Sequence, residues 1–265
     1  MKFWKMSGAG NDFVAFDDRD GRLEGALTPE FISRVCTRGL SVGADGVLIL
    51  RPDPDLRFRM IYHNSDGGRA AMCGNGGRCA AVLAGRLGLV EEGLFEFGSD
   101  SGVHTAELVS STSAKIWMTE PTLHYPRLDL NRAGRSFPVC MVDAGVPHAV
   151  VVTENLDDET FEAAAGLRSH PRAGPEGANV DLVRLEPDGT LTVRTYERGV
   201  EGETLACGTG ALAAVFCLAR RKESFALPAT LRVRSGLTLK VGRDDHGWWL
   251  EGEARVVYEG GLVEP

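Results

Sequence analysis

The sequence predicts an α/β protein of the α+β type, built from two pseudo-symmetric domains that arose by internal duplication. Two cysteines stand in matching Gly-rich turns half a chain apart, at residues 72–77 (MCGNGG) and 206–211 (ACGTGA). Short stretches of alternating apolar and polar residues dominate the rest, as is typical of strands. An apolar helical stretch follows each cysteine. We therefore expect each domain to be a curved, mostly antiparallel sheet wrapped around one buried helix.

The duplication is visible as matches at a nearly constant offset of about half the chain. Residues 43–46, 62–76 and 9–12 match residues 177–180, 196–210 and 144–147 in the same order. The period is too long for a repeat solenoid. It predicts a first domain over 1–118 that is joined by a C-terminal strand at about 253–265, a second domain over 119–252, and a cleft between them.

Strands are expected where apolar residues alternate with polar ones over four to seven positions. In chain order these segments are 47–50, 56–62, 94–97, 115–118, 149–153, 180–185, 190–196, 231–234, 237–241 and 255–258.

Helices are expected to be few. Residues 29–38 follow Thr28, a good N-cap, and begin with a proline at the first helical position. A second helix is expected over 156–167. The helices after the two cysteines, around 79–84 and 211–219, are apolar on nearly all sides, and such helices must be buried all round.

Composition narrows the class of protein. Apolar residues make up 43% and charged residues 25%, and the formal net charge is −8, which argues against a nucleic-acid surface. No apolar stretch approaches the roughly 18–20 residues that span a bilayer, and the N-terminus lacks the apolar core of a signal peptide. A cytoplasmic protein with no membrane partner is expected, with its six cysteines as reduced thiols.

Cys73 and Cys207 are the candidate reactive groups. A helix N-terminus lowers a thiol pKa and offers backbone N–H groups to an anion. Buried core cysteines, zinc ligands and a mutual disulfide are the competing interpretations. The spacings to Cys79 and Cys217 do not fit a structural zinc site, so no metal is expected. The turns fit no phosphate-binding motif and are better matched to a carboxylate.

Two duplicated thiols suggest stereoinversion at a carbon acid. One thiolate would remove the α-proton, and the other thiol would deliver a proton to the opposite face. Charge that develops on the substrate carboxylate would be stabilised by the two helix N-termini. No lysine setting typical of pyridoxal phosphate is evident, and no cofactor is expected. Further candidates are Glu197-Arg198, His148, and the turn asparagines Asn11, Asn64, Asn75 and Asn179.

At these residues the chain closely resembles the diaminopimelate epimerases over nearly its whole length. The matching segments are 6–13 (MSGAGNDF), 43–46 (GADG), 64–67 (NSDG), 72–78 (MCGNGGR), 177–180 (GANV), 196–200 (YERGV) and 203–210 (ETLACGTG).

The resemblance implies a cofactor-independent enzyme that converts LL-2,6-diaminopimelate to the meso form, for lysine and peptidoglycan synthesis. It implies that Cys73 and Cys207 are catalytic, and that His148 and Glu197 tune the thiols. It also implies a homodimer, with Tyr258 at a dimer-contact position. The substrate-binding positions that it implies are Asn11, Asn64, Gly74, Asn75, Asn179, Glu197, Arg198, Gly208 and Thr209.

One departure bears on the substrate. The family usually has Gly-Asn-Pro-His where this chain has Gly145-Val146-Pro147-His148. The missing asparagine is one of the residues that bind the distal, unreacting amino-acid centre of the substrate. A lost hydrogen bond to an ionised group costs roughly 1.5–3 kcal/mol if it is uncompensated. Either a neighbour or water takes its place, or the substrate differs at its far end.

Two alternatives to diaminopimelate epimerisation stay open. The first is another cofactor-independent racemase of the same fold, acting for example on histidine or a basic amino acid. The second is a non-catalytic amino-acid-binding or thiol-redox protein, which predicts that replacing either cysteine leaves function intact. An isomerase of the phenazine type has a related fold but lacks the cysteine pair, so it is set aside.

Overall fold

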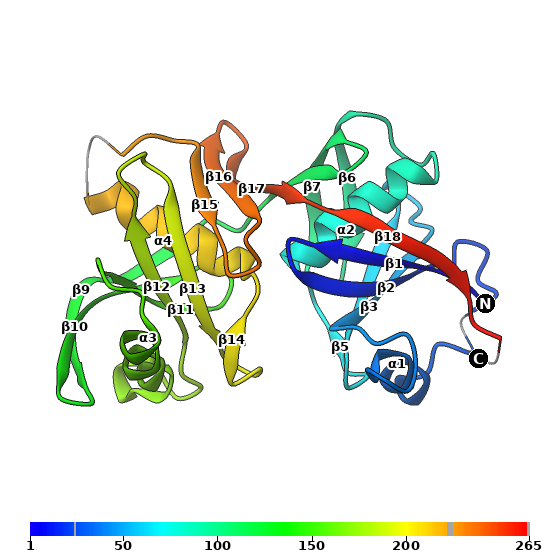
Figure 1. Ribbon diagram of the computed structural model, residues 1–265. Coiled ribbons are helices and arrows are strands. Elements are labelled where there is room, and N and C mark those ends of the chain that lie inside the picture. The colour runs from blue at the N-terminus through cyan, green and yellow to red at the C-terminus, as the bar shows by residue number, and fades with distance from the viewer. Residues whose placement is uncertain (24, 222–224, 264–265) are drawn as a thin grey trace. The chain divides into compact units, whose positions relative to one another are not determined.

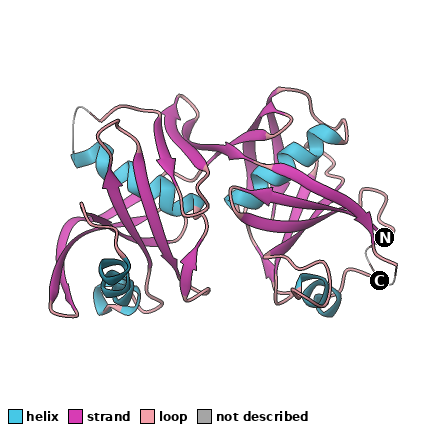
Figure 2. Cartoon of the chain, viewed as in Figure 1, coloured by secondary structure: helices cyan, strands magenta, loops and turns pink. Residues whose placement is uncertain are grey.

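The structure, a computed structural model, describes residues 1–23, 25–221 and 225–263. It is a strand-dominated α/β protein with few helices, as the sequence predicts (Figure 2). The chain divides into two compact units. Unit 1 is Met1–Trp117 with Glu251–Pro265, and unit 2 is Met118–Leu250.

The sheet of unit 1 follows the spatial order β18-β1-β2-β3-β4-β6-β7-β8, with the short β5 on β4 (Figure 1). The β2–β3 and β4–β6 pairs are parallel and the other pairs are antiparallel. Its strands are β1 (Lys2–Gly8), β2 (Asn11–Asp17), β3 (Gly46–Arg51), β4 (Arg59–Asn64), β5 (Arg69–Ala70), β6 (Gly93–Ser99), β7 (Gly102–Ser110), β8 (Ser113–Trp117) and β18 (Arg255–Gly261).

Two helices pack on this sheet. Helix α1 (Pro29–Cys36) begins as expected, because the Thr28 hydroxyl accepts a hydrogen bond from the Phe31 N–H at 3.2 Å. Helix α2 (Gly74–Arg86) is buried from Asn75 to Ala84 and contacts β1 to β4, β7, β8 and β18. The sheet therefore encloses α2, which is the arrangement that an apolar helix requires.

Unit 2 repeats this pattern. Its spatial order is β9-β10-β11-β12-β13-β15-β16, with β14 on β13, and the β11–β12 and β13–β15 pairs are parallel. Its strands are β9 (Thr122–Arg132), β10 (Arg135–Asp143), β11 (Pro147–Val152), β12 (Asn179–Leu185), β13 (Leu191–Glu197), β14 (Gly202–Thr204), β15 (Ala229–Arg232) and β16 (Thr238–Asp244), followed by β17 (Gly247–Glu253), whose last residues belong to unit 1.

The helices of unit 2 cover opposite faces of its sheet. Helix α3 (Asp158–Ala165) packs its Phe161 and Ala164 against Val139 and Met141 of β10. Helix α4 (Gly208–Arg221) is buried along nearly its whole length and contacts β10 to β13. Short 3-10 turns follow α3 at Gly166–Ser169 and Pro171–Ala173.

The two units share one order of elements at one offset. Strands β3 and β5 and helix α2 recur as β12, β14 and α4. Strand β10 pairs with β9, which precedes it, whereas its counterpart β1 pairs with β18 from the other end of the chain. Unit 1 is thus completed by a strand that follows unit 2 in the sequence.

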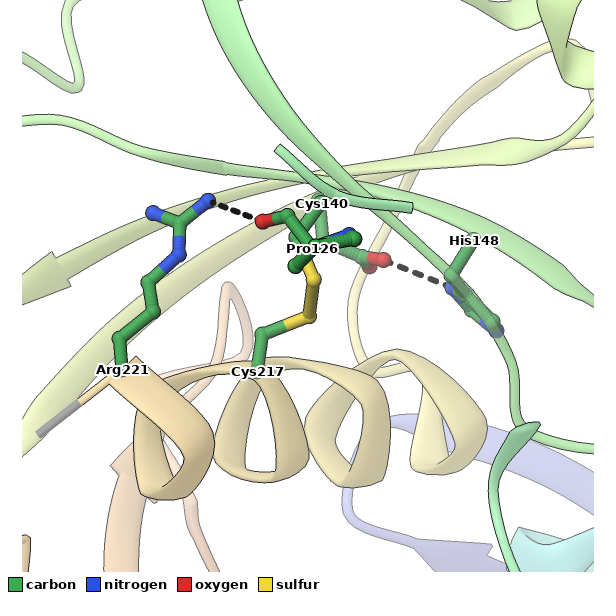
Figure 3. The surroundings of a disulfide bond; sticks show 6 residues. Pro126, Cys140, His148, Cys217 and Arg221 are labelled. Atoms are coloured by element: carbon green, nitrogen blue, oxygen red, sulfur yellow. Dashed lines mark hydrogen bonds and ion pairs between the residues drawn. A yellow bond between two sulfur atoms is a disulfide. The ribbon is translucent and has the colours of Figure 1, made fainter. Parts of the chain in front are cut away.

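One expectation about the cysteines is wrong. Cys140 of β10 and Cys217 of α4 form a disulfide, with Cα atoms 6.5 Å apart, while Cys36, Cys73, Cys79 and Cys207 are thiols (Figure 3). Side chains alternate along a strand, so Cys140 faces α4 when its neighbours face α3. The sequence contains no sign of this pairing, because it depends on the way the helix packs on the sheet. In the described part of the chain no helix is long and apolar enough to cross a membrane.

Candidate active site

Each candidate thiol caps the central helix of its unit in the same way. Cys73 precedes α2, and its Sγ accepts a hydrogen bond from the Gly76 N–H at 3.4 Å. Cys207 precedes α4, and its Sγ accepts from the Gly210 N–H, also at 3.4 Å. A helix N-terminus carries partial positive charge and N–H groups that have no partner within the helix. Each thiol therefore stands beside a site suited to a carboxylate.

In unit 1 a chain of side-chain amides fixes the N-terminus of α2. Asn75 is buried, and its Nδ2 donates to Asn11 Oδ1. Asn11 Nδ2 in turn donates to Asp45 Oδ2 at 3.0 Å. Arg78 Nη2 donates to Asn75 Oδ1 at 2.8 Å. The structure thus brings Asn11 and Asn75 together in the unit that carries Cys73.

In unit 2 a buried histidine connects a carboxylate to the second thiol. His148 is fully buried on β11, and its Nδ1 lies 2.7 Å from Asp181 Oδ2 (dashed in Figure 3). Its Nε2 lies 3.0 Å from Thr209 Oγ1, and that hydroxyl lies 3.4 Å from Cys207 Sγ. Because a carboxylate accepts, Nδ1 carries the proton and a neutral ring accepts at Nε2. The Thr209 hydroxyl then donates its hydrogen to His148 Nε2. The oxygen of the same hydroxyl is left to accept a hydrogen bond from the Cys207 thiol.

The remaining unit 2 candidates gather around this chain. Asn179 begins β12, its Oδ1 accepts from the Arg198 N–H at 2.7 Å, and its Nδ2 lies 3.3 Å from His148 Nε2. The Arg198 guanidinium pairs with Glu176 at 2.9 Å and stays about a quarter exposed. A partly exposed guanidinium held by one exposed glutamate can exchange that partner for a substrate carboxylate.

The surroundings of Cys207 favour the neutral thiol. Burial raises its pKa well above the ordinary value, and the carboxylates of Glu197 and Asp181 raise the pKa further. An uncharged thiol that stays protonated near neutral pH is suited to deliver a proton.

Three further residues singled out in the sequence are partly or largely exposed. Asn64 ends β4, is exposed, and pairs through its backbone with Gly68. Val146 lies in the partly exposed turn before β11. Tyr258 lies on β18, where its ring packs edge-on against Phe3 and stays 46% exposed.

Two residues of the site were missed. Asp181 is fully buried on β12, accepts from Thr195 Oγ1 at 2.8 Å, and contacts His148. A single aspartate inside an otherwise apolar strand, two residues after Asn179 and thus on the same face, is a signal that could have revealed it. Arg78, fully buried in α2, was visible as a charged residue directly before the apolar stretch 79–84.

Gly210 shows how closely the helix approaches this aspartate. A Cβ at that position would meet Asp181 Oδ1, whereas a Cβ at the duplicated Gly76 would meet a methyl group of Leu48 at 2.9 Å. The second site thus needs glycine beside a buried carboxylate. In residues 1–23, 25–221 and 225–263, no three His, Cys, Asp or Glu side chains are grouped so as to hold a metal ion.

Comparison with known proteins identifies the family. The family model described as diaminopimelate epimerase matches residues 3–124 and 140–257. The chain belongs to the diaminopimelate epimerase family. The diaminopimelate epimerase of Chlorobaculum tepidum is 38% identical, over 97% of this chain and 100% of that protein. The diaminopimelate epimerase of Aquifex aeolicus is 37% identical, over 100% of this chain and 98% of that protein.

Solved structures share the fold of this family at low sequence identity. A phenazine biosynthesis protein from Bacillus anthracis aligns with a TM-score of 0.75 at 15% identity, over 100% of this chain and 99% of that one. A probable proline racemase from Agrobacterium radiobacter aligns with a TM-score of 0.72 at 15% identity, over 100% and 93%. The predicted fold class is therefore confirmed.

Proposed function

We propose that this chain interconverts LL- and meso-2,6-diaminopimelate by a two-base mechanism, with Cys73 and Cys207 as the two catalytic residues. The observation that carries the proposal is the duplicated thiol at the N-terminus of a buried helix, with the same backbone cap in both units. Family membership supports the substrate.

In the proposed reaction one thiolate takes the α-proton and the other thiol gives its proton to the opposite face of the carbon. No atom is gained or lost, and the two sulfurs exchange protonation states. Gly74-Asn75 and Gly208-Thr209 supply N–H donors to the reacting carboxylate, whose negative charge grows in the transition state. Asn11, Asn64, Asn179 and Arg198 hold the unreacting amino-acid centre. His148 and Glu197 set the protonation of Cys207.

The decisive experiment follows deuterium uptake and inversion in deuterated water. The wild-type chain should exchange the α-proton of LL-diaminopimelate and accumulate the meso form. Cys73→Ser and Cys207→Ser should each abolish full epimerisation, although each can keep exchange from the face of the remaining thiol. Cys36→Ser, at a buried thiol that ends α1, is the matched control and should keep activity. Full epimerisation by either single variant would contradict the two-base mechanism.

A second candidate is racemisation of another amino acid on the same machinery, and Val146 is the observation that favours it. Valine cannot hydrogen-bond to a distal ammonium or carboxylate group. If diaminopimelate shows no exchange while histidine or a basic amino acid does, this second candidate replaces the first.

Replacing Val146 by asparagine tests the same point quantitatively. If diaminopimelate is the substrate and valine weakens its grip, Val146→Asn should lower KM about tenfold, because a hydrogen bond to an ionised group contributes roughly 1.5–3 kcal/mol. Val146→Ala adds no hydrogen bond and is the control. An unchanged KM in the asparagine variant would mean that another group already fills this role.

We also propose a homodimer in the cytoplasm. The exposed Tyr258 and Val257 on β18 support an interface at that strand, since such residues are enriched at interfaces. A reducing compartment would keep Cys73 and Cys207 as thiols, although a disulfide such as Cys140–Cys217 is rare there.

A further inference from the structure

Arg78 is a buried cation that the proposed mechanism does not use. It lies in the second turn of α2, and its side chain is fully buried. Nη2 donates to Asn75 Oδ1 at 2.8 Å and Nη1 to the Gly74 carbonyl at 3.5 Å, while Nε has no hydrogen-bond partner. Among the residues that the structure describes, no carboxylate pairs with it.

A buried guanidinium without a counter-ion is costly, because water has been removed and no anion replaces it. Burial accordingly lowers the pKa of Arg78, and the thiols of Cys79 and Cys73 act in the opposite direction. Arginine nevertheless stays protonated in proteins. A permanent charge in this place therefore calls for an anion nearby.

Of the two thiols near Arg78, only one is suited to supply that anion. Burial raises the pKa of Cys79 to about 12, so this sulfur stays protonated. Cys73 is partly exposed and stands at the N-terminus of the same helix, where a thiolate is favoured.

Several charged groups on and beside the strands around α2 form ion pairs with one another. Among them are Lys5–Asp12, Lys115–Glu107, Lys2–Glu259, Arg51–Asp18 and Arg59–Asp100, and the His63 ring contacts the Gly67 carbonyl. Arg78 differs from these groups, because it is fully buried and has no carboxylate partner within the described residues.

The duplication supplies a contrast. The offset that relates Cys73 to Cys207 carries Arg78 onto Leu212, so α4 has no equivalent cation. Cys207 is surrounded instead by Glu197 and Asp181. Helix α2 thus places a cation near Cys73, whereas strands β12 and β13 place carboxylates near Cys207.

We propose that Arg78 is the positioning residue that holds Cys73 as the thiolate between turnovers, so that Cys73 is the resting base and Cys207 the resting acid. This assignment rests on the proposed two-base function. The α-proton passes to Cys73 Sγ and the Cys207 proton passes to the carbon. The resting state returns when Cys73 releases its proton to solvent and Cys207 takes one up.

The test measures thiol protonation without substrate. The unliganded full chain is treated with iodoacetamide from about pH 5 to about pH 10, and alkylation of the Cys73 and Cys207 peptides is followed by mass spectrometry. The midpoint of each pH profile reports protonation and does not depend on accessibility. In the wild-type chain the Cys73 midpoint should lie below that of Cys207.

Arg78→Leu installs the residue that the duplication places in α4. It should slow Cys73 alkylation at neutral pH by about tenfold, through a raised midpoint, and leave the Cys207 profile unchanged. Arg78→Lys keeps the charge and should restore most of the rate. A folded Arg78→Leu chain with an unchanged Cys73 profile would overturn the proposal.

The wild-type profiles decide the matter even if Arg78→Leu does not fold, because a Cys73 midpoint at or above that of Cys207 also overturns the assignment. Failure of the proposed function looks different. The chain would then show these alkylation profiles but no exchange of diaminopimelate protons.

Discussion

At the scale of single residues, the two thiols differ more than their matching turns suggest. Cys207 is buried beside Glu197 and Asp181, and its hydrogen bond leads through Thr209 to a buried His148. Burial and the two carboxylates favour the protonated sulfur, and they outweigh the opposite effect of the Thr209 and Gly210 hydrogen bonds. A two-base reaction needs one acid and one base at the start of each turnover, so unequal surroundings serve a symmetric reaction.

Removing the charge of Glu197 tests this account. Glu197→Gln should lower the pKa of Cys207, because one of the carboxylates that raises it is gone. Alkylation of Cys207 at about pH 8 should then accelerate about three- to tenfold. Glu154→Gln, at an exposed glutamate of the same unit, is the control. Equal rates in the two variants would show that Glu197 does not set the protonation of Cys207.

Residue identity alone could reveal part of this site. The thiols, their glycines, His148 and Asn179 stand in recognisable motifs, and the structure places the last two within 3.3 Å of each other. Asp181 and Arg78 were missed because each lies within an element that otherwise reads as apolar core. Their roles depend on which face of the strand or helix they occupy. The composition of an element does not show which face a residue occupies.

At the scale of elements, the disulfide fastens α4, the helix that carries Cys207, to β10. It closes a segment with a sequence separation of 77. Loss of a crosslink over a loop of this size removes roughly 4 kcal/mol by the chain-entropy estimate. Figure 3 also shows the Arg221 guanidinium, at the end of the same helix, donating to the Pro126 carbonyl at 3.4 Å.

We therefore expect Cys140→Ser/Cys217→Ser to unfold at a lower temperature than the oxidised wild-type chain. Differential scanning calorimetry with and without reductant measures this difference. Reductant should lower the wild-type Tm toward that of the double variant and leave the variant unchanged. A variant as stable as the oxidised wild type would show that the crosslink does not contribute to stability.

Element prediction succeeded where local patterns decide and failed where tertiary packing does. The helix after Thr28 and the buried helices after each cysteine follow from caps and apolar faces. Strands β1, β2, β5, β7, β9, β10, β14 and β17 were not expected. Burial is continuous over most of β1 and β2, and β9 is mostly exposed, so these three strands lack the alternation of a half-buried strand.

At the scale of the whole molecule, β18 presents an edge that invites a partner. It pairs with β1 on one side, and its Val257 and Tyr258 are 52% and 46% exposed. Exposed edges with large apolar side chains are unusual in a monomer. The proposed homodimer would cover them.

Light scattering coupled to size-exclusion chromatography tests this interface. The wild-type chain should elute with the mass of two chains, and Tyr258→Asp should shift the population toward one chain, because a buried carboxylate at an interface is unfavourable. Leu40→Asp changes another exposed apolar residue of unit 1, which is 88% exposed, and should not alter the mass. A dimer that survives Tyr258→Asp would place the interface elsewhere.

The strand exchange that completes unit 1 has a consequence for synthesis on the ribosome. Unit 2 is one continuous segment, so it can fold as soon as Leu250 has emerged. Unit 1 contributes the earlier residues but lacks β18 until 255–261 have been made, and β1 keeps an unpaired edge throughout that interval. The half that is translated first is therefore the half that finishes last, and its exposed edge during translation is where a chaperone would be needed.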